Sequence, residues 1–352
     1  MARIPEVQAL YGFDNATLGT TLLCSAIGAI LAMPFTGFLT IRFGSRQLTA
    51  ISGLLFCLGV PFIAIMGSFA GLAILFFCFG MISGALDVSM NAQAVLVEKR
   101  WQKPIMSSFH AVFSVGTAVG AGSGALFARW QVGLTTHFLV IAAFMLLSVL
   151  WAMTQLLPDE KAETTDDTPP FQLPTKAILP LGLIAFCAMM GEGSMADWSA
   201  LYMNKVLGQT ESISALAFAA FATAMTIGRF GGDYVSEKWG INKTLIISSL
   251  VSFFCLLLVL VSSQVPLAML GFFGVGLGLA VIVPIVYSAA GNTEGVNTSV
   301  GISMATTIGY AGFFVGPPVI GYLADIFSLR SALFFPLALF VLMFILAYNR
   351  KK

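Results

Sequence analysis

Long apolar segments limit what this chain can fold into. A helix needs about 20 mostly apolar residues to cross the hydrocarbon core of a bilayer. Only 9% of the 352 residues are charged, whereas soluble domains contain about 25%. We therefore predict an all-α membrane protein with eleven complete spans. The predicted spans are 16–41, 47–66, 69–97, 104–128, 132–157, 177–205, 212–235, 243–262, 265–290, 297–324 and 330–349.

The chain also repeats itself at an offset of 196 residues, as helical membrane transporters commonly do. The recurring positions are Gly116 and Gly312, Gly120 and Gly316, Glu98 and Glu294, and the turns 42–44 (Arg-Phe-Gly) and 238–240 (Lys-Trp-Gly). At this offset the span 177–205 corresponds to positions −19 to 9 of the first copy. We therefore expect two six-helix repeats, with most of helix 1 missing from the sequence.

A polar, proline-rich stretch, 158–176, predicts a cytoplasmic linker between the repeats. The N-terminal half would be 1–157, with helices 2–6, and the C-terminal half 177–352, with helices 7–12. Cytoplasmic loops of membrane proteins are enriched in Lys and Arg. Of the 17 such residues, twelve lie at one end of the predicted helices, four at the other and Arg229 within a span. This bias predicts a cytoplasmic C-terminus, and an even number of helices makes the two repeats parallel.

One loop resembles a family signature. Residues 37–46 (Gly-Phe-Leu-Thr-Ile-Arg-Phe-Gly-Ser-Arg) resemble the G-x-L-x-D-R-x-G-x-R loop between helices 2 and 3 of the major facilitator superfamily, with Ile41 in place of Asp. Residues 191–198 and 309–325 resemble its bacterial YbjJ-type members, which are relatives of the fucose permeases. The resemblance covers essentially the whole chain. It implies a twelve-helix, rocker-switch secondary transporter in the bacterial inner membrane, but it does not identify a substrate.

Three acidic residues, Asp87, Glu192 and Asp197, lie deep in predicted spans. Charged groups at this depth are costly, so they commonly face a cavity and act there. Because loss of water favours the neutral carboxyl group, these residues suit proton carriage. Asp87 shares a helical face with Asn91 and Glu98, which predicts a polar stripe along the cavity. The alternative is a hydrogen bond that only fixes helix packing.

Further candidates line the same predicted cavity. Gly191 and Gly193 flank Glu192 and predict a weakened helix there; interrupted helices often form transporter binding sites. Trp198 either stacks on a ring-like solute or belongs to the interfacial aromatic belt. His110 either lines the cavity or bridges helices near their cytoplasmic ends.

A second set of residues predicts a gate, because it lies in or beside the loops that follow helices 2 and 8, with Glu98 at the end of helix 4 as a partner. The gate candidates are Gly37, Arg42, Gly44, Arg46, Glu98, Arg229 and Asp233. We expect the cations to pair with helix ends or Glu98 in one conformation only, and Arg229 to pair with Asp233 one turn away. The loss of Asp at position 41 weakens the first-half gate. The alternative is that the loop cations only anchor the topology.

The remaining sequence features exclude other functions. No Walker motif, no catalytic constellation and no metal-ligand spacing is present, so we expect neither an enzyme nor a cofactor. The glycine-rich stretches 116–124 and 271–278 lie within spans and predict close helix packing, and Pro284, Pro317 and Pro318 predict kinks. A net charge of +1 gives no indication of nucleic-acid binding.

We predict a monomeric, proton-coupled transporter of a small solute. Sugar-like and drug-like solutes both fit the polar and aromatic candidates. The alternatives are a non-transporting membrane sensor and an inactive truncated transporter.

Overall fold

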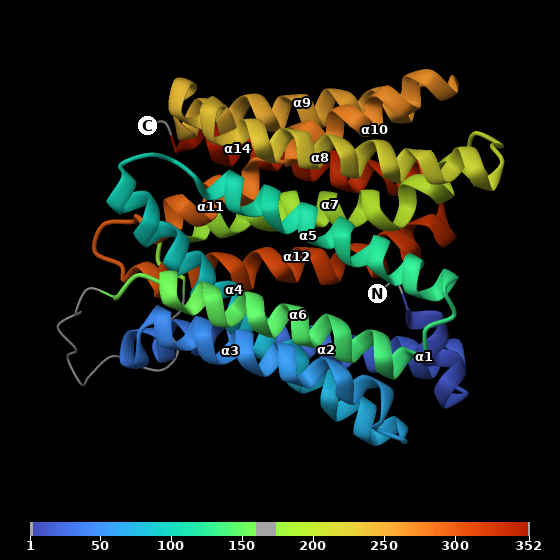
Figure 1. Cartoon of the computed structure of the whole chain (residues 1–352). Helices are drawn as coiled ribbons and strands as arrows, with labels where there is room; N and C mark the ends of the chain where they lie inside the picture. Colours follow the sequence, from blue (N-terminus) through green and yellow to red (C-terminus); the bar gives the residue numbers. More distant parts are fainter. Residues whose placement is uncertain (1–2, 160–173, 351–352) are drawn as a thin grey trace. The chain divides into compact units, whose positions relative to one another are not determined.

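The computed structural model describes residues 3–159 and 174–350, and every regular element in this part of the chain is a helix. Figure 1 shows their course. The helices are α1 (Ile4–Tyr11), α2 (Asn15–Phe43), α3 (Ser45–Gly59), the 3₁₀ helix η1 (Val60–Ala64), α4 (Phe69–Trp101), α5 (Met106–Arg129), α6 (Leu134–Gln155), α7 (Leu179–Lys205), α8 (Glu211–Trp239), α9 (Ile241–Val261), α10 (Val265–Leu279), α11 (Ile282–Gly291), α12 (Thr298–Ile326), α13 (Leu329–Ala332) and α14 (Phe334–Asn349).

The predicted all-α membrane fold is confirmed. Eleven helical segments within the described residues are long and apolar enough to cross a membrane, and their limits differ from the predicted spans by only a few residues. The ninth span consists of two helices, α10 and α11, which meet between Leu279 and Ile282. Pro284 explains the break, because proline has no N–H to donate to the carbonyl of Ala280. By contrast, α12 continues through Pro317 and Pro318.

The chain forms two compact units that do not follow the sequence in two simple blocks. Unit 1 comprises Met1–Arg100, Phe113–Leu173 and Val296–Ser303. Unit 2 comprises Trp101–Val112, Pro174–Gly295 and Met304–Lys352. The start of α5 therefore belongs to unit 2, whereas the start of α12 belongs to unit 1.

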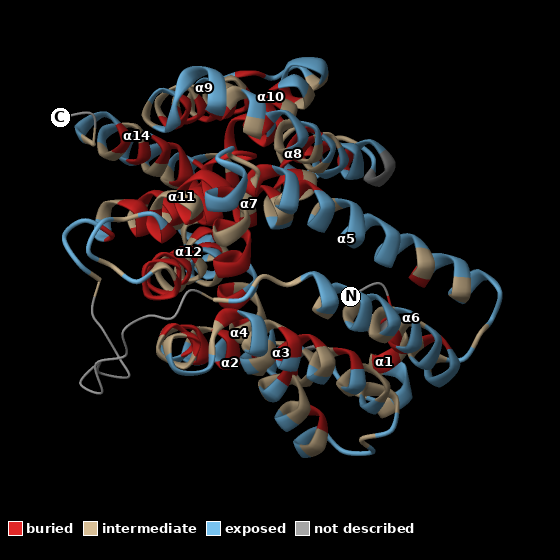
Figure 2. Cartoon of the chain, turned by 60° about the vertical axis from the view of Figure 1, so that its left-hand side comes forward, coloured by how far each residue is buried: buried red, intermediate tan, exposed pale blue. Residues whose placement is uncertain are grey.

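The core of unit 2 is built around α7 and α10. Helix α10 packs against α8 and α9, and α7 packs against α8, α11 and α14. Figure 2 shows the buried residues concentrated in α7, α10 and α11, whereas α5 and α6 are largely exposed. The exposed side chains of α6 include Phe144, Leu147 and Trp151. Such apolar surface is suited to lipid contact.

The backbone repeats the 196-residue offset at the turns that follow α2 and α8. Gly44 has φ 85° and ψ 149°, and Gly240 has φ 77° and ψ 156°. Their N–H groups donate to the carbonyls of Thr40 at 2.8 Å and Ser236 at 2.9 Å, which are also 196 residues apart. Glycine is required in both turns, since side chains disfavour this backbone conformation.

The prediction of close packing at the glycine-rich stretches is confirmed for 271–278. There, Gly274 lies against Cys255 and Gly278 against Ser252, so α10 approaches α9 closely. For 116–124 it stays a prediction. Gly124 is buried, whereas a methyl group added at Gly116 or Gly120 would meet no atom within 4 Å among the described residues.

Candidate functional site

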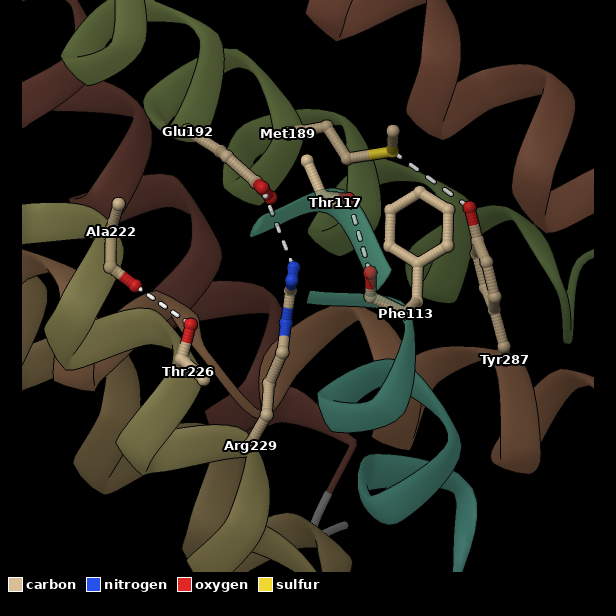
Figure 3. Close-up of polar contacts among 8 residues, drawn as sticks. All are labelled: Phe113, Thr117, Met189, Glu192, Ala222, Thr226, Arg229 and Tyr287. Carbon is tan, nitrogen blue, oxygen red and sulfur yellow. Dashed lines mark hydrogen bonds and ion pairs between the residues drawn. The ribbon is translucent and has the colours of Figure 1, made fainter. Parts of the chain in front are cut away.

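An ion pair between two helices forms the centre of the candidate site in unit 2. Arg229 Nη2 of α8 lies 3.4 Å from Glu192 Oε1 of α7 (Figure 3). Their side chains are 11% and 28% exposed, respectively. Both residues were predicted from the sequence, but their pairing was not. The signal in the sequence was that Arg229 is the one basic residue in the interior of a predicted span, since the others within the span limits are terminal residues.

The expected pair between Arg229 and Asp233 is not formed. Arg229 extends towards α7, whereas Asp233 accepts hydrogen bonds at the start of α5. Its carboxylate accepts from the backbone N–H of Ser107 and of Ser108, both at 2.8 Å, and also from the Ser108 hydroxyl. The first N–H groups of a helix lack intrahelical acceptors, and the helix dipole favours a negative charge there. Sequence spacing on α8 alone could not reveal either partner.

The predicted interruption of α7 beside Glu192 is wrong. Helix α7 is continuous from Leu179 to Lys205. A Cβ atom added to the flanking Gly191 would lie 2.5 Å from the ring of Phe340 on α14, so glycine at this position makes room for a neighbouring aromatic side chain. Tight packing by α14 supports the helix that glycine would otherwise weaken.

Further polar side chains of unit 2 lie around the pair. The ring of His110, at the start of α5, lies 6.0 Å from the ring of Tyr287 on α11. The Tyr287 hydroxyl donates to Met189 Sδ at 3.8 Å, as Figure 3 shows. Tyr287 was not predicted as a site residue, because a tyrosine within an apolar segment has no distinctive spacing.

Two other candidates on α7 are separate from the pair. Asp197 is exposed, and within the described residues no hydrogen bond joins it to Glu192. Trp198 lies against α12, where a methyl group on Gly321 would be 3.6 Å from the indole ring. The indole Nε1 is buried and has no acceptor among the described residues. Within unit 2, Asp197 and Trp198 are thus not joined to the Glu192–Arg229 pair by any hydrogen bond or ion pair among the described residues.

A second polar site lies on α4 in unit 1. Asn91 Nδ2 donates to the carbonyl of Asp87 at 2.8 Å and to its Oδ1 at 3.3 Å. The other carboxylate oxygen, Oδ2, is buried without a hydrogen-bond partner in the described part of the chain. Two glycines of α4 lie against the backbone of α2: Gly80 contacts Ser25 and Gly84 contacts Ala29. Helix α2 therefore approaches α4 closely near Asp87.

Two of the gate candidates, Gly37 and Asp233, make contacts that are related by the repeat. In unit 1, Ser303 Oγ of α12 donates to the Met33 carbonyl at 2.6 Å. A Cβ atom on Gly37 would lie 2.9 Å from Ser303 Cβ, so only glycine permits this approach. Ser303 corresponds by offset to Ser107, and Gly37 to Asp233. At equivalent positions of the repeat, Gly37 thus makes a close backbone contact with α12 in unit 1, whereas Asp233 accepts hydrogen bonds from α5 in unit 2.

The other gate candidates differ in how far their side chains are exposed. Glu98 is buried at 7% exposure, whereas Arg42 and Arg46 are exposed. The Arg42 guanidinium lies 5.8 Å from the ring centre of Phe43. Among the described residues no group of three or more His, Cys, Asp or Glu side chains could hold a metal ion.

Comparison with known proteins identifies the family. The model of the Major Facilitator Superfamily matches residues 2–293 and 181–351. The chain belongs to this superfamily. The resemblance seen in the 37–46 loop is thereby confirmed.

Superfamily members of known sequence or structure match over nearly the whole chain. An uncharacterized MFS-type transporter of Yersinia pestis is 37% identical over 329 residues, which cover 94% of this chain and 85% of the relative. The outward-conformation structure of the superfamily transporter FucP has a TM-score of 0.82 at 15% identity and covers 100% of this chain and 94% of FucP. A structure of the E. coli fucose:proton symporter FucP has a TM-score of 0.77 with the same identity and coverage. As a member of this superfamily with eleven apolar helices in its described part, the chain is a multi-pass membrane transporter.

Proposed function

We propose that the chain is a proton-coupled secondary transporter that carries a small polar solute by alternating access. The observation that carries this proposal is the Glu192–Arg229 pair between two membrane-spanning helices of unit 2. The superfamily membership supports transport, and the fucose:proton symporter among similar folds supports protons as the coupling ion and a sugar-like solute.

Coupling follows from the ion pair between Glu192 and Arg229. While Glu192 is ionised, its carboxylate pairs with the guanidinium of Arg229. Proton binding to Glu192 neutralises the carboxylate and weakens this pair. A solute that offers hydroxyl or carbonyl oxygens to Arg229 would then bind more favourably. Proton and solute binding are reciprocally linked in this scheme.

Asp87 provides a second proposed proton site. Its unpartnered Oδ2 can take a proton without breaking a hydrogen bond, while Asn91 holds the other oxygen. His110, Asn91, Asp197 and Trp198 remain proposed contributors to solute or proton binding.

We propose that the repeats form the halves 1–157 and 177–352, joined by the linker 158–176, with parallel orientation and a cytoplasmic C-terminus in a bacterial inner membrane. Gly37, Arg42, Gly44, Arg46, Glu98, Arg229 and Asp233 form the proposed gate. The Asp233 contact with the start of α5 supports it, because a carboxylate held by helix-end N–H groups and the Ser108 hydroxyl can be released without breaking a helix.

Transport by purified chain in proteoliposomes tests the proposal. Solutes that raise the Tm in a library screen would first be selected and then measured in uptake with and without an imposed proton gradient. We expect concentrative uptake with the gradient, and loss of concentration but not of equilibration in Glu192→Gln and Asp87→Asn. Glu237→Gln, which changes an exposed carboxylate near the end of α8, is the matched control.

Two results together would contradict proton coupling: uptake that does not depend on pH, and full concentrative uptake by Glu192→Gln and Asp87→Asn. A folded chain that binds a solute without moving it would favour the alternative of a membrane sensor.

A further inference from the structure

Unit 1 contains a polar cavity of about 750 Å³ whose lining includes the gate candidates Arg42, Gly44 and Arg46. The transport proposal gives this cavity no role as a binding site. It lies where α2 and α4 end and where α3 and α12 begin, next to residues 158–159. Helices α2, α4 and α12 are each long and apolar enough to span the membrane, and α3 begins another such span. Since the cavity lies at the ends of these spans, we place it at the boundary between hydrocarbon and water. A ligand here could have both a polar and an apolar part.

Three cations line this cavity. Arg42 and Arg46 are exposed, and neither forms an ion pair within the described residues. Lys99 Nζ donates to Thr298 Oγ1 at 3.1 Å, which fixes it at the start of α12. The one acidic residue of the lining is Asp159. The lining therefore has a net positive charge and favours an anion.

The cavity already holds an oxyanion supplied by the chain itself. Asp159 Oδ1 accepts from the Ser45 backbone N–H at 2.8 Å and from the Ser45 hydroxyl at 2.5 Å, and Oδ2 accepts from the Arg46 N–H at 3.1 Å. This is a built anion site at the first turn of α3, with cationic side chains beside it. Phosphate groups bind in the same way to helix starts flanked by Lys and Arg.

We propose that this cavity binds the phosphate headgroup of an anionic phospholipid. The phosphate would lie among Arg42, Arg46 and Lys99, next to the carboxylate of Asp159. The apolar lining residues Ile41 and Leu96, with the half-exposed ring of Phe43, provide surface for the glycerol and upper acyl chains. Assignment to the cytoplasmic leaflet rests on the orientation proposed above, whereas binding itself does not depend on transport activity.

The second repeat offers a matched control, because it lacks this set of cations. At the 196-residue offset, Lys238 corresponds to Arg42, but Asn242 corresponds to Arg46 and Gly295 to Lys99. The control variant Lys176→Gln/Lys238→Gln/Lys243→Gln removes three charges at the same proposed end of the helices. The test variant is Arg42→Gln/Arg46→Gln/Lys99→Gln. Both variants change the net charge of the protein by the same amount.

The experiment measures lipid binding to the full chain in nanodiscs by native mass spectrometry and by Tm. Nanodiscs of phosphatidylcholine are compared with nanodiscs containing phosphatidylglycerol, and inorganic phosphate and glycerol 3-phosphate form separate arms. A cation that contacts the bound phosphate contributes about fivefold to affinity. The test variant should therefore lose roughly a hundredfold, whereas the control removes cations that do not line the cavity and should lose much less. Asp159→Asn should bind phosphatidylglycerol more tightly, because it removes the competing negative charge.

Equal losses in the test and control variants would overturn the proposal, since they would indicate only a general attraction to the membrane surface. Stabilisation by inorganic phosphate or glycerol 3-phosphate as large as that by phosphatidylglycerol would identify a soluble ligand and overturn the lipid assignment. Unchanged or weaker binding by Asp159→Asn, with an unchanged Tm in phosphatidylcholine, would show that the phosphate does not occupy this cavity.

Discussion

The carboxylate of Asp233 holds the first turn of α5 through the backbone N–H of Ser107, at 2.8 Å. The two residues are 126 positions apart and lie on helices from different halves of the sequence, yet they belong to the same compact unit. The contact joins the start of α5 to α8 and agrees with the grouping of both in unit 2.

Asp233→Asn should loosen the start of α5. Hydrogen bonds to a charged group contribute about 1.5–3 kcal/mol, so we expect exchange of the Ser107 and Ser108 amides to accelerate about tenfold or more. Hydrogen exchange followed by mass spectrometry measures this directly. Glu237→Gln on the same helix is the control, and equal acceleration in both variants would show that the contact is not specific.

Removing one partner of the Glu192–Arg229 pair should destabilise unit 2 more than removing both. Glu192→Gln leaves the guanidinium of Arg229, only 11% exposed, without the carboxylate that lies beside it. We expect a coupling free energy of about 1–3 kcal/mol in a double-mutant cycle of Glu192→Gln and Arg229→Gln, measured by unfolding in detergent. Strictly additive effects would mean that the pair at 3.4 Å contributes nothing to stability.

Alanine should be tolerated poorly at Gly44 and Gly240 alike. Both turns use positive φ, and a side chain in this conformation costs about 1–3 kcal/mol. The Tm of each variant should therefore fall. The fall should be larger for Gly44→Ala, because its methyl group would also lie 2.6 Å from Asp159 Oδ2, whereas one at Gly240 meets nothing within 4 Å. Gly231→Ala is the control, because Gly231 lies within α8 where a methyl group meets nothing within 4 Å; its Tm should stay the same or rise. A Tm for Gly240→Ala as high as that of the control would show that the backbone conformation of the turn does not require glycine.

Gly116 and Gly312 should respond differently to alanine although the repeat relates them. A methyl group at Gly312 would clash with the backbone of Phe186 on α7, whereas one at Gly116 meets no atom within 4 Å. Overpacking typically costs about 1–3 kcal/mol, so Gly312→Ala should lower the Tm and Gly116→Ala should not. Equal losses would indicate that both positions are covered by neighbouring helices.

The contrast between these glycines shows where sequence reasoning stops. The recurrence of Gly116 as Gly312 was visible in the sequence, but the neighbour that makes only the second one tight was not. Likewise, Glu192 and Arg229 were each conspicuous as charges in apolar segments. The local i, i+4 relation suggested Asp233 as the partner of Arg229, whereas the partner on α7 depends on how two helices are rotated against each other.

The sequence alone determined the number and limits of the spans, because the length of an apolar segment is a local property that the bilayer thickness constrains. It also determined the glycine turns at 44 and 240, since their backbone conformation excludes other residues. Only the tertiary structure decided that Glu192 meets Arg229, that Asp233 meets the start of α5, and that Asp159 lies among the cations of unit 1. Each of these contacts joins segments distant in the sequence, and helix packing selects such partners rather than local residue preference.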